Sequence, residues 1–416
     1  MNSNTSIANC NYISSKDVKQ IVYKYLNTKK VIIESYSIER ASEKMLGYLC
    51  EYWKLKVIVD SDCKELCFFI KAICRFNDAK AEMVKEFNLY KKELCFYSTI
   101  KEIIKIPDLK PWSAELVETL NDAMVFEDLN ALDYKLHDKF HRFDMQHILQ
   151  ALNTIARFHA SSIIYEEKQS NKLQRSYRLD EDFGQVLDKA GYSESSPWFL
   201  QCMNGALEAI KVFIEFNDKD KSLIESRWNE IWLSALSLSS PSNKYKNVVS
   251  HRDLWNNNIL FHYDNKGEPD ECVLVDFQAI RYQPPAGDVM LLLCCNLDPK
   301  FREEHLTEFL NHYYEELKRI LQDNGIIIED ILTKDEFFAS AEEQRKWGLV
   351  ICACLLPQVW IDDDQTMEIF SDAAQYDDIL LKNKAAFIIK MMKENVSYQE
   401  KVMEIFIEIV GRYCLE

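Results

Sequence analysis

Short apolar runs and longer helical stripes alternate along this chain of 416 residues. Three runs have the length of single strands, and each is followed directly by a charged residue: 66–74, 124–126 and 273–275. Such runs are typical of buried β-strands. Between the first two runs, apolar residues recur at spacings of three and four from Met83 to Ile100, which predicts a long amphipathic helix.

Beyond residue 129 the pattern is mainly helical, with one clear helix predicted over 145–164. The chain is therefore expected to have an α+β fold with two lobes. The small lobe, residues 1–129, would hold an antiparallel sheet and one long helix, after a lead-in over 1–29 that contains a short helix. The large, mostly helical lobe would occupy residues 130–416.

Composition indicates a cytoplasmic protein with large cores. Hydrophobic residues make up 47% of the chain, whereas Gly and Pro number only 9 each, so no low-complexity linker is expected. The net charge of −17 disfavours nucleic acid and anionic membranes as partners. No signal peptide or membrane-spanning run is recognisable, the 13 cysteines lack paired spacing and are expected to be reduced, and no obligate protein partner is evident.

The candidate chemistry lies around His251-Arg-Asp253-Leu-Trp-Asn-Asn-Asn258, which is followed by a predicted strand ending at Asp276. Phosphoryl transfer requires a group that orients the acceptor hydroxyl and oxygen ligands for Mg²⁺. Asp253 fits the first task, with His251 beside it in the catalytic motif. Asn258 and Asp276 fit the second as metal ligands. The order and spacing of these residues favour a kinase-like site that uses ATP and Mg²⁺.

A site of this kind requires a lysine on an upstream strand, and Lys71 interrupts the run 66–74. A lysine there needs an anionic partner, such as ATP phosphates and a helix glutamate. Glu93, beside the predicted helical stripe, is the preferred partner, and Glu86 is the second choice.

The run 124–126 stops at two acids, where the hinge between the lobes is expected. Backbone groups of the stretch from Phe126 through Glu127 to Leu129 would then bind adenine.

Departures from the protein-kinase pattern indicate a small-molecule acceptor. Trp255 stands where protein kinases have a lysine, two positions after the catalytic aspartate. Only twelve residues separate Asp276 from Asp288, which leaves no room for a long activation segment. A glycine-rich phosphate loop is also missing, because Gly47 is the single glycine in residues 31–60.

Two rival sites are less well supported. Asp182-Phe183-Gly184 matches a metal-binding tripeptide, but it precedes His251 and follows a polar stretch, so a loop or helix cap is expected. His137, His141 and His147 could form a metal site only if the first two shared one helical face. His159 is expected to be a packed or capping histidine.

Together these motifs resemble the ecdysteroid kinase-like family of insects, which is related to choline kinases and aminoglycoside phosphotransferases. The resemblance also rests on Gln278 after Asp-Phe, on Arg281-Tyr282 and on Ala156-Arg-Phe-His-Ala160. It implies a protein-kinase-like fold and ATP-dependent phosphorylation of a hydroxyl on a small lipophilic alcohol, with ecdysteroids and dietary toxins as acceptor classes. Arg252 departs from the glycine usual at that position.

The acceptor itself is not specified by the motifs. Aromatic residues in 190–240 could wall a pocket, although at least half are expected to be core; they are Trp198, Phe199, Phe213, Phe216, Trp228 and Trp232. The acids at 362–364 could bind polyol hydroxyls but are more typical of a solvated loop. A choline- or sugar-type kinase and a catalytically silent small-molecule binding protein remain alternatives.

Overall fold

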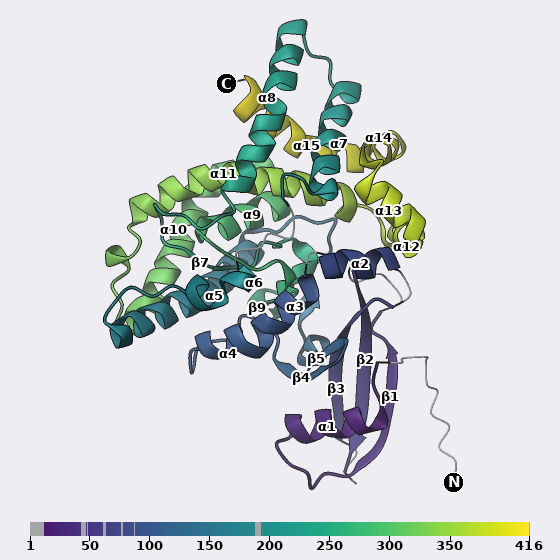
Figure 1. The fold of residues 1–416 in the computed structure, drawn as a ribbon, viewed down its shortest axis with the longest axis vertical. Helices are drawn as coiled ribbons and strands as arrows, with labels where there is room; N and C mark the ends of the chain where they lie inside the picture. Colours follow the sequence, from purple (N-terminus) through teal and green to yellow (C-terminus); the bar gives the residue numbers. More distant parts are fainter. Residues whose placement is uncertain are drawn as a thin grey trace.

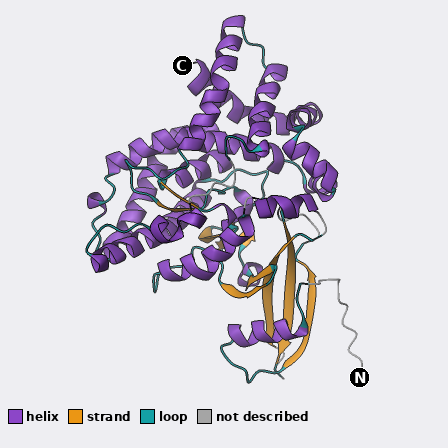
Figure 2. Ribbon diagram, viewed as in Figure 1, coloured by secondary structure: helices purple, strands orange, loops and turns teal. Residues whose placement is uncertain are grey.

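The computed structural model describes residues 12–42, 47, 49–60, 64–75, 78–86, 88–187 and 193–415. Its small lobe is built on a five-stranded antiparallel sheet of order β1-β2-β3-β5-β4, with helix α1 against it (Figures 1 and 2). The elements are α1 (Ser15–Tyr25), β1 (Ile33–Arg40), β2 (Cys50–Val59), β3 (Lys64–Ile73), α2 (Asp78–Glu86), α3 (Leu89–Cys95), the π-helical turn η1 (Phe96–Ile100), α4 (Lys101–Ile104), β4 (Leu116–Leu120) and β5 (Ala123–Glu127).

The two apolar runs predicted as strands in this lobe are the central strands of the sheet. Strand β3 lies between β2 and β5, with Lys71 opposite Tyr52 on one side and Met124 on the other. Alternation along β3 buries Phe68 and Ile70 against α1 and the sheet core. The lysine is therefore held on a central strand with neighbours on both sides.

The long helix predicted over 83–100 is divided in the structure. Helix α2 ends at Glu86, and Asn88 adopts a left-handed conformation with φ 56° before α3 begins. Asparagine tolerates this region better than most residues. The break separates α2 from α3, which carries Glu93. Phe87 and the side chains of Met83 and Glu86 lie outside the described residues.

The large lobe is mainly helical, as expected, with two small sheets beside the helices (Figure 2). Helix α5 starts at the predicted Met145 but continues to Leu173. The elements are η2 (Leu129–Leu132), β6 (Lys135–Leu136), α5 (Met145–Leu173), α6 (Leu179–Leu187), α7 (Pro197–Phe213), α8 (Asp218–Ser237), β7 (Val248–Ser250), η3 (Asn256–Asn258), β8 (Ile259–Tyr263), β9 (Pro269–Leu274), η4 (Phe277–Ala279), β10 (Arg281–Gln283), α9 (Ala286–Asn296), α10 (Pro299–Asp323), η5 (Ile328–Asp330), α11 (Lys334–Val359), α12 (Asp363–Ser371), α13 (Ala373–Leu381), α14 (Lys384–Glu394), α15 (Val396–Ile409) and η6 (Val410–Leu415).

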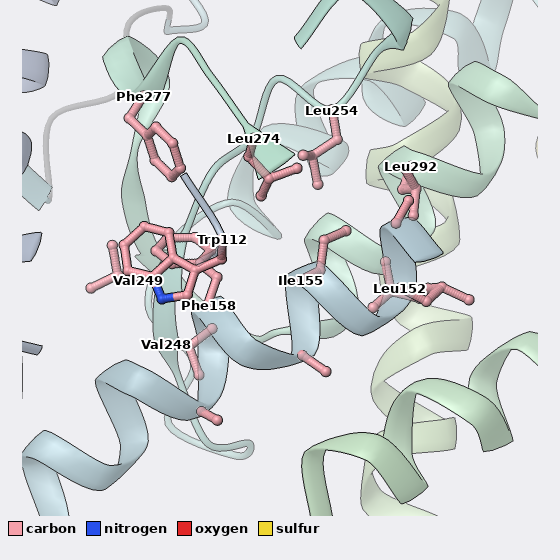
Figure 3. Close-up of a cluster of buried hydrophobic side chains, with 14 of the residues drawn as sticks. Trp112, Leu152, Ile155, Phe158, Val248, Val249, Leu254, Leu274, Phe277 and Leu292 are labelled. Atoms are coloured by element: carbon pink, nitrogen blue, oxygen red, sulfur yellow. The ribbon is translucent and has the colours of Figure 1, made fainter. Parts of the chain in front are cut away.

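The predicted two-lobed α+β architecture is confirmed, and the lobes share one core under the motif residues. Leu254 and Phe277, which stand beside the two motif aspartates, are buried with Phe158 of α5 and Leu292 of α9 (Figure 3). Apolar anchors of this kind fix the backbone of loops that would otherwise be mobile. We propose that the boundary between the lobes lies between residues 129 and 130.

The C-terminal helices return toward the small lobe. Helix α13 contacts α2, with the ammonium of Lys80 5.4 Å from the ring centre of Tyr376 (Figure 1). Among the helices in the described part of the chain, none combines the length and apolar character needed to cross a membrane.

Candidate active site

A cleft between the lobes brings the predicted site residues together. It holds about 140 Å³ of space accessible to water. Lys71 and Glu93 line it from the small lobe, and Asn258 and Asp276 line it from the large lobe. Residues separated by more than 200 positions in the sequence thus face one cavity.

Lys71 forms two ion pairs at the centre of this cleft. Its Nζ atom lies 2.6 Å from Glu93 Oε2 and 2.6 Å from Asp276 Oδ1. Burial alone would lower the pKa of Lys71, but Asp276 and Glu93 raise it well above its ordinary value. The lysine is therefore a fixed positive charge. The Glu86 side chain, the second choice, lies outside the described residues.

Asp253 and Asn258 are hydrogen bonded to each other. The Asn258 amide nitrogen donates to the Asp253 carboxylate at 2.9 Å and to the Asp253 main-chain oxygen at 2.8 Å. Burial, followed by the negative charge of Asp276, raises the pKa of Asp253 to about 7. A carboxyl that titrates near neutral pH can exchange a proton with an acceptor hydroxyl under physiological conditions.

His251 is fully buried, and its ring holds the backbone of the motif. Nε2 donates to the Val275 carbonyl at 2.8 Å, and Nδ1 accepts from the Asp253 amide at 3.2 Å. Burial lowers the pKa of His251, which favours the neutral ring that these two bonds require. The predicted catalytic histidine therefore positions Asp253 and links it to the strand before Asp276.

Asp276 and Arg252 both adopt left-handed backbone conformations, with φ 67° and 68°. This region is unfavourable for residues other than glycine and is often stabilised by surrounding structure at functional sites. Phe277 stacks on Phe96 at 4.3 Å and anchors the turn at Asp276. The Arg252 side chain is buried over the ring of Trp347 at 5.4 Å. The backbone keeps a conformation that glycine would favour, although the residue is arginine.

The proposed metal ligands present oxygen atoms to the cleft. Asp276 lies at its wall and also accepts a hydrogen bond from Gln278 Nε2 at 3.2 Å. The Asn258 amide nitrogen is occupied by Asp253, which leaves its amide oxygen for another partner. One carboxylate and one neutral oxygen suit Mg²⁺, which keeps several waters and takes further oxygens from phosphates. These residues fit the predicted ion.

The predicted adenine-binding stretch also faces the cleft. Phe126, Glu127 and Leu129 all line it, where β5 passes into η2. Glu127 itself is held by the Glu115 main-chain nitrogen, which donates to its Oε1 at 3.0 Å. The Glu127 side chain therefore fixes the backbone of the hinge, and the C-terminal end of β5 faces the cavity.

The residues of the two alternative metal sites, Asp182, His137 and His141, do not line the cleft. Asp182 lies within α6, not in the loop or helix cap expected from the sequence, and accepts a hydrogen bond from the Tyr177 hydroxyl at 2.8 Å. His137 and His141 lie in a loop rather than on a shared helical face, and among the residues described no three or more His, Cys, Asp or Glu side chains are grouped so that they could hold a metal.

The aromatic residues of the 190–240 segment are mainly core, as expected. Four are buried in a second cluster with α11 and the C-terminal helices: Trp198, Phe199, Trp228 and Trp232. Phe213 and Phe216 pack on the edge of the same cluster. Of the acids at 362–364, Asp362 caps α12 and Asp363 pairs with Lys139.

Two buried acids near the site were not recognised from the sequence. Asp288 on α9 accepts hydrogen bonds from the backbone amides of His251 and Arg252 at 2.6 and 2.9 Å, and it pairs with His159. An acid at the start of an otherwise apolar helix was the available signal. Asp128 pairs with Lys54 at 2.8 Å and ties the hinge to β2.

Comparison with known proteins gives a family match, a related sequence and structural similarities with low TM-scores. The profile of the ecdysteroid kinase-like family matches residues 46–326. An uncharacterized kinase-like protein of Caenorhabditis elegans is 25% identical over 255 residues, which are 60% of this chain and 62% of that relative. The match thus spans less than two thirds of the relative's length.

Two small-molecule kinases are among the solved structures that resemble this chain with low TM-scores. A choline kinase from Cryptosporidium parvum Iowa II is 12% identical with a TM-score of 0.45, over 95% of this chain and 98% of that one. A Plasmodium vivax ethanolamine kinase is 12% identical with a TM-score of 0.44, over 93% and 91%.

Proposed function

Because the chain belongs to the ecdysteroid kinase-like family, we propose that it transfers the γ-phosphate of ATP to a hydroxyl of a lipophilic small molecule, such as an ecdysteroid or a dietary toxin. The observation that carries the proposal is the convergence of Lys71, Glu93 and Asp276 in the cleft, with Asp253 and Asn258 adjacent. A buried, permanently charged lysine between two acids, beside a carboxyl of raised pKa, suits phosphoryl transfer.

Each residue has a separate task in the proposed reaction. Lys71 binds phosphate oxygens, and Glu93 keeps its side chain in place. The Asp253 carboxylate accepts the hydrogen bond of the acceptor hydroxyl and takes its proton as the acceptor oxygen bonds to the γ-phosphorus. The bond from that phosphorus to the β–γ bridging oxygen breaks, and ADP leaves. Mg²⁺, when bound, would be held by Asp276 and Asn258 and would neutralise phosphate charge. The stretch 126–129 would bind the adenine base.

Two alternatives lead to different results. A choline- or sugar-type kinase would phosphorylate choline or a sugar in preference to a steroid. A silent binding protein would bind ATP or a small molecule without transfer; the absence of a glycine-rich phosphate loop favours it, whereas the presence of all five predicted side chains opposes it.

Mass spectrometry of acceptors incubated with Mg·ATP tests the proposal. The panel comprises ecdysteroids, plant phenolics, glycosides and choline. We expect addition of phosphate to a steroid or phenolic hydroxyl. Product from choline or a glycoside alone would support the first alternative. ATP binding without any product would support the second, and no ATP binding would refute the kinase assignment.

A further inference from the structure

A second, smaller cavity lies on the other side of the catalytic loop from the nucleotide cleft. Asn257 and Asn258 line the cleft, whereas Trp255 and Asn256 line the second cavity. The loop that begins with Asp253 therefore separates two hollows. A phosphotransferase must bind an acceptor as well as a nucleotide, and the second cavity, on the loop that follows Asp253, is a candidate for the acceptor.

The charged groups that line this cavity are all basic. Among the described residues they are Lys139, His141, Arg142 and Lys401, and no aspartate or glutamate shares the lining. Lys139 is neutralised by Asp363 at 2.8 Å, and Arg142 pairs with Glu404. These two acids belong to the surroundings of the cavity rather than to its wall.

Lys401 differs from Lys139 and Arg142 because it forms no ion pair among the described residues, although Glu404, which pairs with Arg142, attracts it from one turn further along α15. The residue is only 5% exposed, and its ammonium lies 4.3 Å from the ring centre of Trp360. In the part of the chain that the structure describes, no carboxylate or hydrogen-bond acceptor pairs with it. Burial, followed by repulsion from Arg142, lowers the pKa of Lys401 to about 7. A buried ammonium without an anion is costly and is stabilised by an electron-rich ligand.

The cavity is small in this structure, with about 20 Å³ of space accessible to water, enough for roughly one molecule. Two contacts border it: the Lys139–Asp363 ion pair and the edge-on contact of Phe140 with Trp360 at 5.5 Å. Both join the loop before α5 to the junction of α11 and α12. Opening at these contacts would expose the indole rings of Trp255 and Trp360, which suit a flat apolar ring system.

We propose that this cavity is the acceptor site and that Lys401 selects ring-shaped acceptors carrying neutral or anionic oxygen groups while rejecting cationic ones. The inference rests on the proposed function, for which it specifies the acceptor class. It separates this chain from a choline-type kinase by chemistry, because a quaternary ammonium would meet like charge and no acid at the wall of the cavity.

Equilibrium binding of three matched probes tests the assignment without relying on turnover. The probes are cholate, cholamide and N-(2-aminoethyl)cholamide, which share one hydroxylated ring system and carry a negative, neutral or positive side chain. At about pH 6, where Lys401 is mainly charged, we expect the wild-type protein to bind the first two at least about tenfold more tightly than the third. Lys401→Met, which keeps the length but removes the charge, should reduce the difference to about threefold or less.

Lys393→Met is the matched control, because Lys393 is exposed on the neighbouring helix α14 and the substitution makes the same change in net charge. It should bind all three probes as the wild type does. Equal or tighter binding of the cationic probe, unchanged discrimination in Lys401→Met, or no binding of any probe would overturn the assignment. Failure of the kinase proposal would be seen separately, as a loss of ATP binding or transfer with the probe preferences intact.

Discussion

At Asp253, the proposed function requires a charged carboxylate, whereas the stability of the fold favours a neutral carboxyl. Its carboxyl is partly buried near Asp276, and the pKa is raised to about 7. A proton acceptor needs the charged form, whereas the fold favours the neutral form at this position. Asn258 offsets part of that penalty through its hydrogen bond to the carboxylate.

The rate of transfer should therefore depend on pH through Asp253. The deprotonated carboxylate is the active form, so kcat/KM should rise as the pH rises through about 7 and level off above it. Initial rates at saturating Mg·ATP, measured from pH 5.5 to about pH 8.5 across that value, would give the profile. A rate that is constant over this range would show that Asp253 does not titrate in the rate-determining step.

The raised pKa of Asp253 also predicts that replacing this residue stabilises the protein. The folded-state pKa of Asp253 lies above the value of an unfolded aspartate, near 4. The folded state therefore binds more protons between these values, and stability falls as the pH rises from about 4 to 7. Asp253→Asn should unfold at a higher temperature than wild type at pH 7.5 and show little difference at about pH 4. A lower melting temperature at both pH values would contradict this explanation.

Lys71 has the opposite effect on stability, because it neutralises buried acids. Lys71→Met leaves Glu93 and Asp276 facing each other without a cation, and we expect the free energy of unfolding to fall by about 3 kcal/mol. ATP binding should weaken as well. Urea unfolding and nucleotide titration would measure the two effects.

The control is Lys64→Met, at the exposed start of the same strand, which should leave both quantities unchanged. Equal losses in the two variants would assign the effect to the strand rather than to the ion pairs.

Helix α9 positions the catalytic motif through its first turn. Its Asp288 holds the backbone amides of His251 and Arg252, and α9 packs along α11. Gly348 of α11 is the point of closest approach, since an added Cβ would lie 3.0 Å from the main-chain carbon of Met290. The position of the catalytic loop thus depends on helix packing far from the cleft.

Gly348→Ala should push these helices apart. Because the obstructing atoms are backbone, the substitution should destabilise the protein by about 1–3 kcal/mol and lower transfer activity through Asp288. Gly411→Ala, where nothing lies within 4 Å, should be neutral or slightly stabilising. Denaturant unfolding of both variants measures this, and equal stability would show that the helices adjust without cost.

The elements near the site were the most predictable from sequence, for a physical reason. The apolar runs 66–74, 124–126 and 273–275 fall in β3 and β5 and at the end of β9, and each run contains or directly precedes a charged residue, so both strand type and chemistry are visible locally. The break at Asn88 was missed, because the apolar spacing continues across it. Asp288 and Lys401 were missed because their roles depend on contacts with residues distant in sequence, which no local pattern reports.

For the whole molecule, the central claim is that two lobes and two cavities serve one reaction at Asp253. The small lobe contributes Lys71 and Glu93, the large lobe contributes the loop and Asp276, and the second cavity lies behind Trp255. Residues on both sides of the hinge are needed before any of them can act. The arrangement predicts transfer rather than nucleotide binding alone.

The most direct test is transfer of labelled γ-phosphate from Mg·ATP to a polyhydroxylated steroid by the wild type, Asp253→Asn and Asp218→Asn. Asp218 is an exposed acid on α8 and provides the matched control. We predict labelled steroid with the wild type and Asp218→Asn, and a loss of about 100-fold or more with Asp253→Asn while ATP binding is retained. Equal transfer by Asp253→Asn, or ATP binding with no transfer to any hydroxylated acceptor, would contradict the account.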